Sequence, residues 1–270
     1  MRITMKALAV AAALLVCCLP ALASAADSSL MDIQMKQSLV LGLDPTFAPM
    51  GFEDEDGNIV GFDIDVALEV CSRLGVELVC QPIIWEEKEQ KLNDKSIDCI
   101  WNGLSISPDR MASMQISVPY MHNEMILVVR SDSGIENKAD LAGKKLGLQA
   151  GSTAEDALAE DASFKASLGQ IVLLVDNLEA LTELRQGNLD AVLLDLVVAD
   201  YYVPAEDTAL TYLEETMMPE DYGIGFRRAD ESLMKAVNNA LFDMVREGRL
   251  AQISVKWFGR DLTTVKNYMD

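Results

Sequence analysis

The residues with the clearest chemistry lie in segment 98–110, which reads Asp-Cys-Ile-Trp-Asn-Gly-Leu-Ser-Ile-Ser-Pro-Asp-Arg. Its apolar first half predicts a buried strand, and Pro108 is typical of the first turn of a helix. Gly103 has no Cβ, so a ligand can approach the backbone closely, and Ser105 offers a hydroxyl. Arg110 lies one short turn further on, where its guanidinium can hold a carboxylate through two parallel hydrogen bonds. The alternative is an ordinary strand-to-helix turn with a surface arginine.

A second strand-loop-helix unit contains the loop Gly-Ser-Thr-Ala-Glu at 151–155. Ser152 fits a helix N-cap, and Glu155 three residues later completes a capping box. The free N–H groups at a helix start attract anions, so this loop, with Thr153, could hold the same carboxylate as Arg110. A plain helix cap is the competing interpretation, and the two are compatible.

Two acidic residues follow strands that the sequence predicts to be buried. Asp195 ends the run 190–195, where its carboxylate could pair with an ammonium ion or simply cap the helix expected at 196–202. Asp44 and Phe47 follow the first strand, at the carboxyl end where open α/β sheets place ligands. A turn-capping aspartate and a core phenylalanine are the alternatives for this second pair.

The elements that must position these residues alternate between strand and helix. The first half reads as strand, loop, helix, strand, helix and strand, which is typical of a largely parallel sheet covered by helices. The second half repeats that pattern, so the fold class that we predict is α/β, with two α/β sandwich lobes joined by two crossover strands and a cleft between them. Lobe 1 is expected at 26–120 and 223–270, lobe 2 at 126–216, and the hinge strands at about 120–125 and 217–222.

The N-terminal 25 residues predict a secretory signal peptide. A basic start precedes an apolar stretch too short to span a membrane, and Ala-Ser-Ala at 23–25 fits the small-residue cleavage pattern. Cys17 raises a lipid anchor as an alternative, but Val16 stands before it where a small residue is expected. A periplasmic or extracellular location follows, with a lipid-anchored form as the less favoured interpretation.

Composition excludes several classes of function. The formal net charge of −21 repels nucleic acid and anionic membranes. One histidine and sparse cysteines form no zinc pattern, so we expect no metal and no cofactor. Cys71 and Cys80 could form a disulfide in an exported protein, and the alternative is that they and Cys99 are buried thiols.

At this point the motifs together become recognisable. The chain resembles the type 3 family of extracellular solute-binding proteins, the amino-acid receptors of bacterial ABC importers. The resemblance covers 39–258 and rests on ordered fragments that are weak singly and specific together. These are Asp-Pro-Thr-Phe-Ala-Pro at 44–49, Gly-Phe-Asp-Ile-Asp at 61–65, Asn-Gly-Leu-Ser-Ile-Ser-Pro-Asp-Arg at 102–110, Gly-Ser-Thr at 151–153, Asp-Ala-Val at 190–192 and Lys-Trp-Phe-Gly at 256–259.

The resemblance implies a role for each candidate residue. Arg110 would grip the α-carboxylate of an amino acid, and Asp195 would receive its α-ammonium group. The remaining matches are Thr153 and the backbone at Ser152 for the carboxylate, Gly103 and Ser105 for first-lobe contacts, Phe47 and Trp85 as aromatics on both sides of the ligand's side chain, and Asp44 facing its tip.

The function implied is binding of a polar or basic L-amino acid by a monomer and its delivery to ABC permease subunits by lobe closure. The alternative is a periplasmic cyclohexadienyl dehydratase, acting on prephenate or arogenate, because such enzymes resemble this family. That reaction needs a general acid over a ring substrate. Every acid–base group here is explained by ligand binding, so we expect a protein that is not an enzyme.

Overall fold

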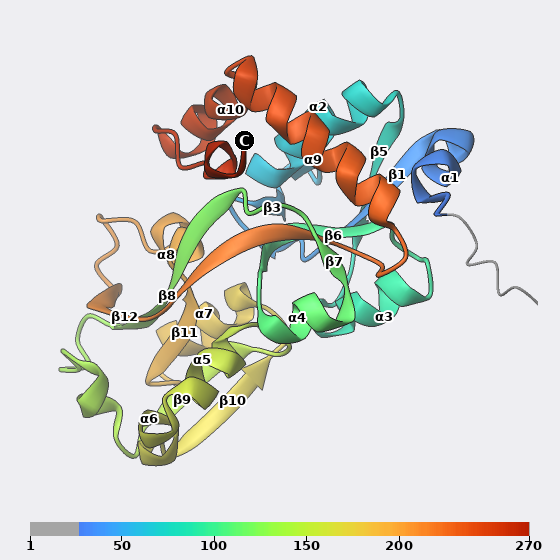
Figure 1. The fold of residues 1–270 in the computed structure, drawn as a ribbon. Helices are drawn as coiled ribbons and strands as arrows, with labels where there is room; N and C mark the ends of the chain where they lie inside the picture. Colours follow the sequence, from blue (N-terminus) through green and yellow to red (C-terminus); the bar gives the residue numbers. More distant parts are fainter. Residues whose placement is uncertain (1–26, 270) are drawn as a thin grey trace, which may run out of the picture.

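The computed structural model of the protein describes residues 27–269, so the predicted signal peptide and Cys17 lie outside the described residues. Two α/β lobes are built on a nine-stranded sheet and a small three-stranded sheet (Figure 1). The strands are β1 Ser38–Leu43, β2 Thr46–Phe47, β3 Gly51–Glu53, β4 Ile59–Val60, β5 Glu77–Pro82, β6 Cys99–Ser105, β7 Gln115–Ile116, β8 Met121–Arg130, β9 Lys145–Gln149, β10 Gln170–Leu174, β11 Ala191–Asp195 and β12 Leu210–Phe226.

The helices cover both lobes. They are α1 Ser29–Lys36, α2 Phe62–Leu74, α3 Lys88–Asn93, α4 Pro108–Ser113, α5 Ala154–Glu160, α6 Ala162–Ser167, α7 Asn177–Arg185, α8 Leu196–Tyr202, α9 Glu231–Arg246 and α10 Arg249–Phe258, with short 3₁₀ turns at Trp85–Glu87, Lys138–Leu141 and Val265–Tyr268. None of these helices has the length and hydrophobicity that a membrane-spanning segment requires.

The strand order of the large sheet explains the two-lobed shape. The order is β10-β9-β11-β8-β12-β6-β1-β5, in which β1 pairs in parallel with β5 and β6, and β9 pairs in parallel with β10 and β11. The long antiparallel strands β8 and β12 lie between these two parallel groups and run from one lobe to the other (Figure 1). The predicted α/β fold with two crossover strands is therefore confirmed, while the residue boundaries of the lobes stay a prediction.

Local sequence signals account for most element ends. Gly75 ends α2 in the left-handed conformation with φ 72°, a conformation that costs glycine little. Ser107 accepts a hydrogen bond from the backbone N–H of Arg110 and caps α4, while Pro108 occupies its first turn. Ser107 and Pro108 thus place Arg110 in the first turn of α4, close after the end of β6, where it reaches the Gly151 carbonyl of the second lobe.

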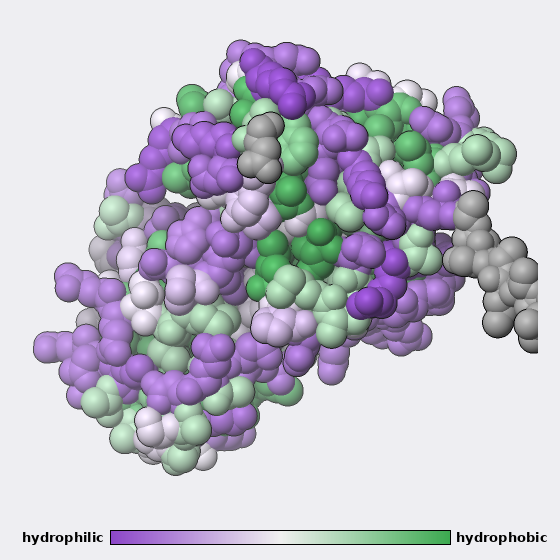
Figure 2. All heavy atoms as spheres, in the orientation of Figure 1, coloured by the Kyte–Doolittle hydropathy of each residue, from purple (hydrophilic) through white to green (hydrophobic). Residues whose placement is uncertain are grey.

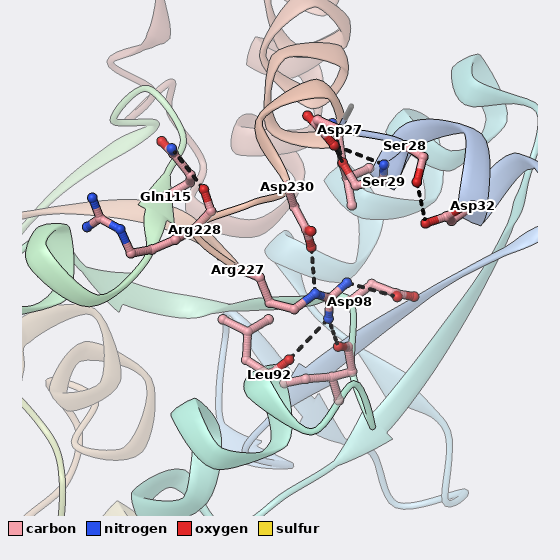
Figure 3. A network of polar contacts seen from close by, with 12 residues as sticks. Asp27, Ser28, Ser29, Asp32, Leu92, Asp98, Gln115, Arg227, Arg228 and Asp230 are labelled. Atoms are coloured by element: carbon pink, nitrogen blue, oxygen red, sulfur yellow. Dashed lines mark hydrogen bonds and ion pairs between the residues drawn. The ribbon is translucent and has the colours of Figure 1, made fainter. Parts of the chain in front are cut away.

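A buried ionic network fixes the other end of β6. Arg227 Nε lies 2.7 Å from Asp230 Oδ2, its Nη1 donates to the Leu92 and Ile97 carbonyls at 3.1 and 2.7 Å, and its Nη2 lies 3.6 Å from Asp98 Oδ1 (Figure 3). Ile97 and Asp98 lie directly before β6, Leu92 belongs to α3, and Arg227 and Asp230 lie in the turn before α9. The network therefore holds the strand that presents the site residues.

The surface agrees with the acidic composition. Hydrophilic residues cover much of the face in Figure 2 over both lobes, and hydrophobic side chains show as separate areas between them, one of them near the middle. Several of the largest side chains are fully buried, including Trp101, Tyr120 and Phe62.

The disulfide between Cys71 and Cys80 that the sequence allowed is not formed. In the part of the chain that the structure describes, Cys71, Cys80 and Cys99 are all free thiols. Cys71 lies on the buried face of α2 and Cys99 on the fully buried strand β6, where burial raises the pKa of Cys71 to about 12 and that of Cys99 well above its usual range. The alternative of buried thiols describes Cys71 and Cys99, and Cys80 is half-buried.

Candidate functional site

Arg110 lies in the cleft between the lobes and not on the surface. Its side chain is 7% exposed, with Nη1 donating to the Ser105 carbonyl at 2.8 Å and Nη2 to the Gly151 carbonyl at 3.2 Å. Burial lowers the pKa of Arg110, while the carboxylates of Glu220 and Asp156 act in the opposite direction. A guanidinium has five N–H donors, so three remain for a ligand.

Asp195 faces Arg110 from the second lobe. It occupies the N-cap position of α8 but its side chain makes no cap hydrogen bond, so capping does not explain it. Its Oδ1 accepts from the Tyr222 hydroxyl at 2.5 Å and from Asn123 Nδ2 at 2.9 Å, and the side chain is buried. The carboxylate is therefore held in a fixed orientation at the cleft, which is what an ammonium receptor requires.

The structure brings eight of the nine predicted site residues around one space. Gln149, which the sequence did not single out, completes the wall. The predicted eight are Phe47, Trp85, Gly103, Ser105, Arg110, Ser152, Thr153 and Asp195. The enclosed volume is only ≈ 10 Å³, close to the minimum for one water molecule. A carboxylate, a guanidinium and aromatic rings from different lobes therefore line one narrow cleft.

Gly103 is required by both its conformation and its neighbours. Its φ is +59°, and a Cβ built there would lie 2.5 Å from Phe47 Cε1. Its N–H donates to Asp63 Oδ2 at 2.8 Å, and the Tyr120 hydroxyl donates to the same oxygen at 2.9 Å. Asp63 is fully buried, and burial raises its pKa to about 7. This buried carboxyl thus fixes the backbone against which the Phe47 ring packs.

The capping box predicted for the second-lobe loop is wrong. The helix begins at Ala154, with Thr153 in the cap position and no side-chain cap bond. Ser152 Oγ instead donates to the Gln149 carbonyl at 2.8 Å, and Glu155 Oε1 accepts from the Gly151 N–H at 2.8 Å. These bonds tighten the loop itself, because the chain turns before the helix starts and leaves the Thr153 hydroxyl free to face the first lobe.

Asp44 lies beside this space and does not line it. Its Oδ2 accepts from Gln149 Nε2 at 2.7 Å, and its Oδ1 accepts from the Thr46 N–H and hydroxyl at 2.9 and 2.8 Å. Burial raises the pKa of Asp44. With Trp85 and Asp176 it lines a neighbouring cavity of ≈ 190 Å³. Trp85 belongs to both spaces, so the cavity extends the cleft toward two acids.

A comparison with protein families decides the class. The model of the bacterial extracellular solute-binding proteins, family 3, matches residues 39–260. The chain belongs to this family. As a family 3 solute-binding protein it has the two-lobed fold that its motifs predict.

Individual relatives agree with the family. The chain is 31% identical over 243 residues to the L-cystine-binding protein TcyJ of Escherichia coli (strain K12), covering 89% of this chain and 90% of that protein. A substrate-binding protein of an ABC uptake transporter from Streptococcus pneumoniae with bound histidine has a TM-score of 0.85 at 35% identity, over 88% of this chain and 98% of that one. The structure of Tv2483 bound to L-arginine has a TM-score of 0.86 at 29% identity, over 89% and 98%. Two of the three are named as binding proteins and the third holds L-arginine, which supports the expected binding protein over the dehydratase alternative.

The cleft of this solute-binding protein is held closed by hydrogen bonds between the lobes. Lys88 Nζ donates to the Gly151 carbonyl at 2.7 Å, the Tyr202 hydroxyl donates to the Thr46 carbonyl at 2.8 Å, and Thr153 Oγ1 lies 3.1 Å from Ser105 Oγ. Burial, followed by the charge of Arg110, lowers the pKa of Lys88 to about 7. A molecule as large as an amino acid can enter only when these bonds open.

Sequence reasoning missed the groups that orient the predicted residues. Lys88, Asn123, Gln149, Glu220 and Tyr222 all lie at the cleft, and each reaches a predicted site residue or its loop. The contacts of most of these five residues join segments that are far apart in the sequence. Glu220 carries one local signal, since it follows a proline inside a predicted crossover strand.

Proposed function

We propose that the protein binds a polar or basic L-amino acid between its lobes and delivers it to the permease subunits of an ABC importer. One observation carries the proposal. The buried guanidinium of Arg110 and the buried carboxylate of Asp195 come from different lobes and line the same space. A free amino acid is a small zwitterion whose two charged groups complement these two side chains.

Lobe closure follows from this arrangement. A ligand that contacts Arg110 and Asp195 together interacts fully only with the closed form, so it shifts the equilibrium toward closure. Removal of water from the cleft strengthens both ionic contacts by lowering the local dielectric constant. We expect the closed form, as a monomer, to be the form that a permease recognises, in the periplasm or at the outer face of the cell.

The neighbouring cavity supports a preference for ligands with a donor group at the side-chain tip. Its walls include Asp44 and Asp176, and the aromatic ring of Trp85 connects it to the main space. A carboxylate accepts hydrogen bonds and attracts cations, so L-arginine, L-lysine and L-glutamine suit this end of the cleft better than apolar amino acids do. The solved neighbours that bind arginine and histidine are consistent with this preference.

Isothermal titration calorimetry of the mature protein with the twenty common L-amino acids and L-cystine tests the proposal. We expect one or a few polar ligands to bind at micromolar or lower dissociation constants, and their D-enantiomers to bind far more weakly. Failure of every member of the panel to bind would exclude this function.

Asp44→Asn tests the assignment of the side-chain end. If Asp44 faces the tip of the ligand, the variant loses more affinity for L-arginine than for L-glutamine, because only the former places a positive charge there. An equal loss for both ligands would remove Asp44 from the specificity of the cleft.

A further inference from the structure

A second acid lies behind Asp195. Glu220 is buried on β12, directly opposite Asn123 of β8 in the antiparallel register. Asn123 Nδ2 donates to Asp195 Oδ1 at 2.9 Å and to Glu220 Oε1 at 2.8 Å. Two oxygens that accept from the same nitrogen lie within about 6 Å of each other. Two carboxyl groups therefore share one corner of the cleft.

The orientation of the bridging amide is fixed. Asn123 Oδ1 accepts from the Val197 N–H at 3.4 Å, so its amide nitrogen faces the two acids. The second oxygen of Glu220, Oε2, accepts from Thr153 Oγ1 at 2.8 Å. Glu220 thus contacts Thr153, which is predicted to meet the ligand's carboxylate. It also contacts Asn123, which donates to Asp195, the residue predicted to meet the ligand's ammonium group.

The donors to this pair are neutral. Asp195 accepts from Tyr222 and Asn123, and Glu220 accepts from Asn123 and Thr153. Two buried carboxylates this close resist joint ionisation, because each charge is poorly solvated and repels the other.

The charged neighbours do not remove this conflict. The charge of Arg110 on α4 interacts with Glu220 first, then with Asp156 on α5, and also with Asp195, so one cation is shared among several carboxylates. Lys88 lies on the far side of Arg110, near the Gly151 carbonyl that both side chains contact. Burial and then the charge of Glu220 raise the pKa of Asp195 well above its usual range.

We propose that Glu220 is a second acid of the ammonium-binding corner, and that it and Asp195 hold one shared proton which leaves when the ligand's ammonium group binds. This inference rests on the proposed function, and it adds a residue and a proton to it. The ammonium group supplies the positive charge that lets both carboxyl groups ionise. The proton passes to the solvent, and no covalent bond to the ligand forms or breaks.

Proton release gives the pair a measurable consequence. Ligand affinity decreases as the pH falls below the pKa of the pair, by up to about tenfold per pH unit. The reason is that protons at lower pH compete more strongly with the ligand for the two carboxyl groups. At higher pH both acids are already ionised, and the affinity becomes independent of pH in this respect.

Calorimetry in two buffers of different ionisation enthalpy, phosphate and Tris, measures the protons released at one pH. The titrant is the member of the amino-acid panel that binds most tightly. When the titration is repeated over a series of pH values, the wild-type protein should release up to one proton per ligand where its affinity falls with decreasing pH, and Glu220→Gln should release less than half of that at the same pH while still binding. Glu214→Gln is the matched control, since Glu214 is exposed on the same strand, and it should behave as wild type.

Two results would overturn the inference while the proposed function stands: binding without proton release by the wild-type protein, or unchanged release by Glu220→Gln. If no amino acid binds, the proposed function fails, and the shared proton is tested by carbon NMR titration of the side-chain carboxyl groups of the ligand-free protein. One carboxyl of the pair should titrate well above the usual value of about 4 in the wild type, and the Glu220→Gln variant should lower it. Titration of both groups near 4 would refute the shared proton.

Discussion

Substitution of Arg110 tests the anion-binding half of the cleft. Two of its N–H groups contact the carbonyls of Ser105 and Gly151, so three donors remain to hold a carboxylate in a buried position. Arg110→Met keeps an unbranched apolar stem and removes the guanidinium with its charge. Truncation of one partner of a buried, hydrogen-bonded charge pair costs about 2–5 kcal/mol, which is a loss of affinity of roughly thirtyfold to several thousandfold.

Arg110→Lys separates charge from geometry. Lysine keeps the positive charge but cannot form two parallel hydrogen bonds to a carboxylate, so we expect an intermediate loss of about 1–3 kcal/mol. The assay is calorimetric titration with the amino acid that the wild-type protein binds most tightly. Thermal unfolding of each variant shows that the fold is retained.

The control is Arg246→Met on α9, where the side chain is exposed and pairs only with Asp243 in the described chain. This variant should bind as the wild type does. If Arg110→Met stays folded and keeps its affinity within about threefold of the wild type, the ligand's carboxylate is held elsewhere and the reasoning is refuted.

Three further predictions concern the scaffold. Gly103→Ala should lower the free energy of unfolding by about 1–3 kcal/mol in urea and weaken ligand binding, because its φ of +59° and the Phe47 ring oppose a Cβ; an unchanged protein would contradict this. The folded protein retains a proton on Asp63 up to about pH 7 that the unfolded chain releases near pH 4. The wild type should therefore lose stability relative to Asp63→Asn by roughly 1.4 kcal/mol per unit of rising pH across that window, whereas a constant difference would show that Asp63 ionises normally. Cys71 and Cys99 should react with Ellman's reagent only after unfolding, and rapid reaction in the native state would contradict their burial.

The elements were predictable where local signals are strong. The helix expected at 196–202 matches α8, which a buried strand precedes. Phe47, Asp195 and the loop of Ser152 and Thr153 were found because they lie at or after strand ends, which meet at one edge of a parallel sheet, whereas Trp85 was assigned only through the family resemblance.

The rest depends on contacts between distant segments. Asn123 and Glu220 face each other only because of the register between β8 and β12, and neither carries a local motif that announces the pairing. Ser152 and Glu155 have the spacing of a capping box, but the loop turns before the helix starts and uses both side chains itself. The distribution of bonds within a turn depends on a competition among several donors and acceptors, which sequence spacing alone does not decide.

A crystal structure of the mature protein with its amino acid bound tests the central claim most directly. The account predicts the ligand's carboxylate within hydrogen-bond distance of the Arg110 guanidinium and its ammonium group on Asp195, with the side chain directed past Trp85 toward Asp44. An amino acid bound outside the cleft, or one whose charged groups contact neither Arg110 nor Asp195, would contradict it.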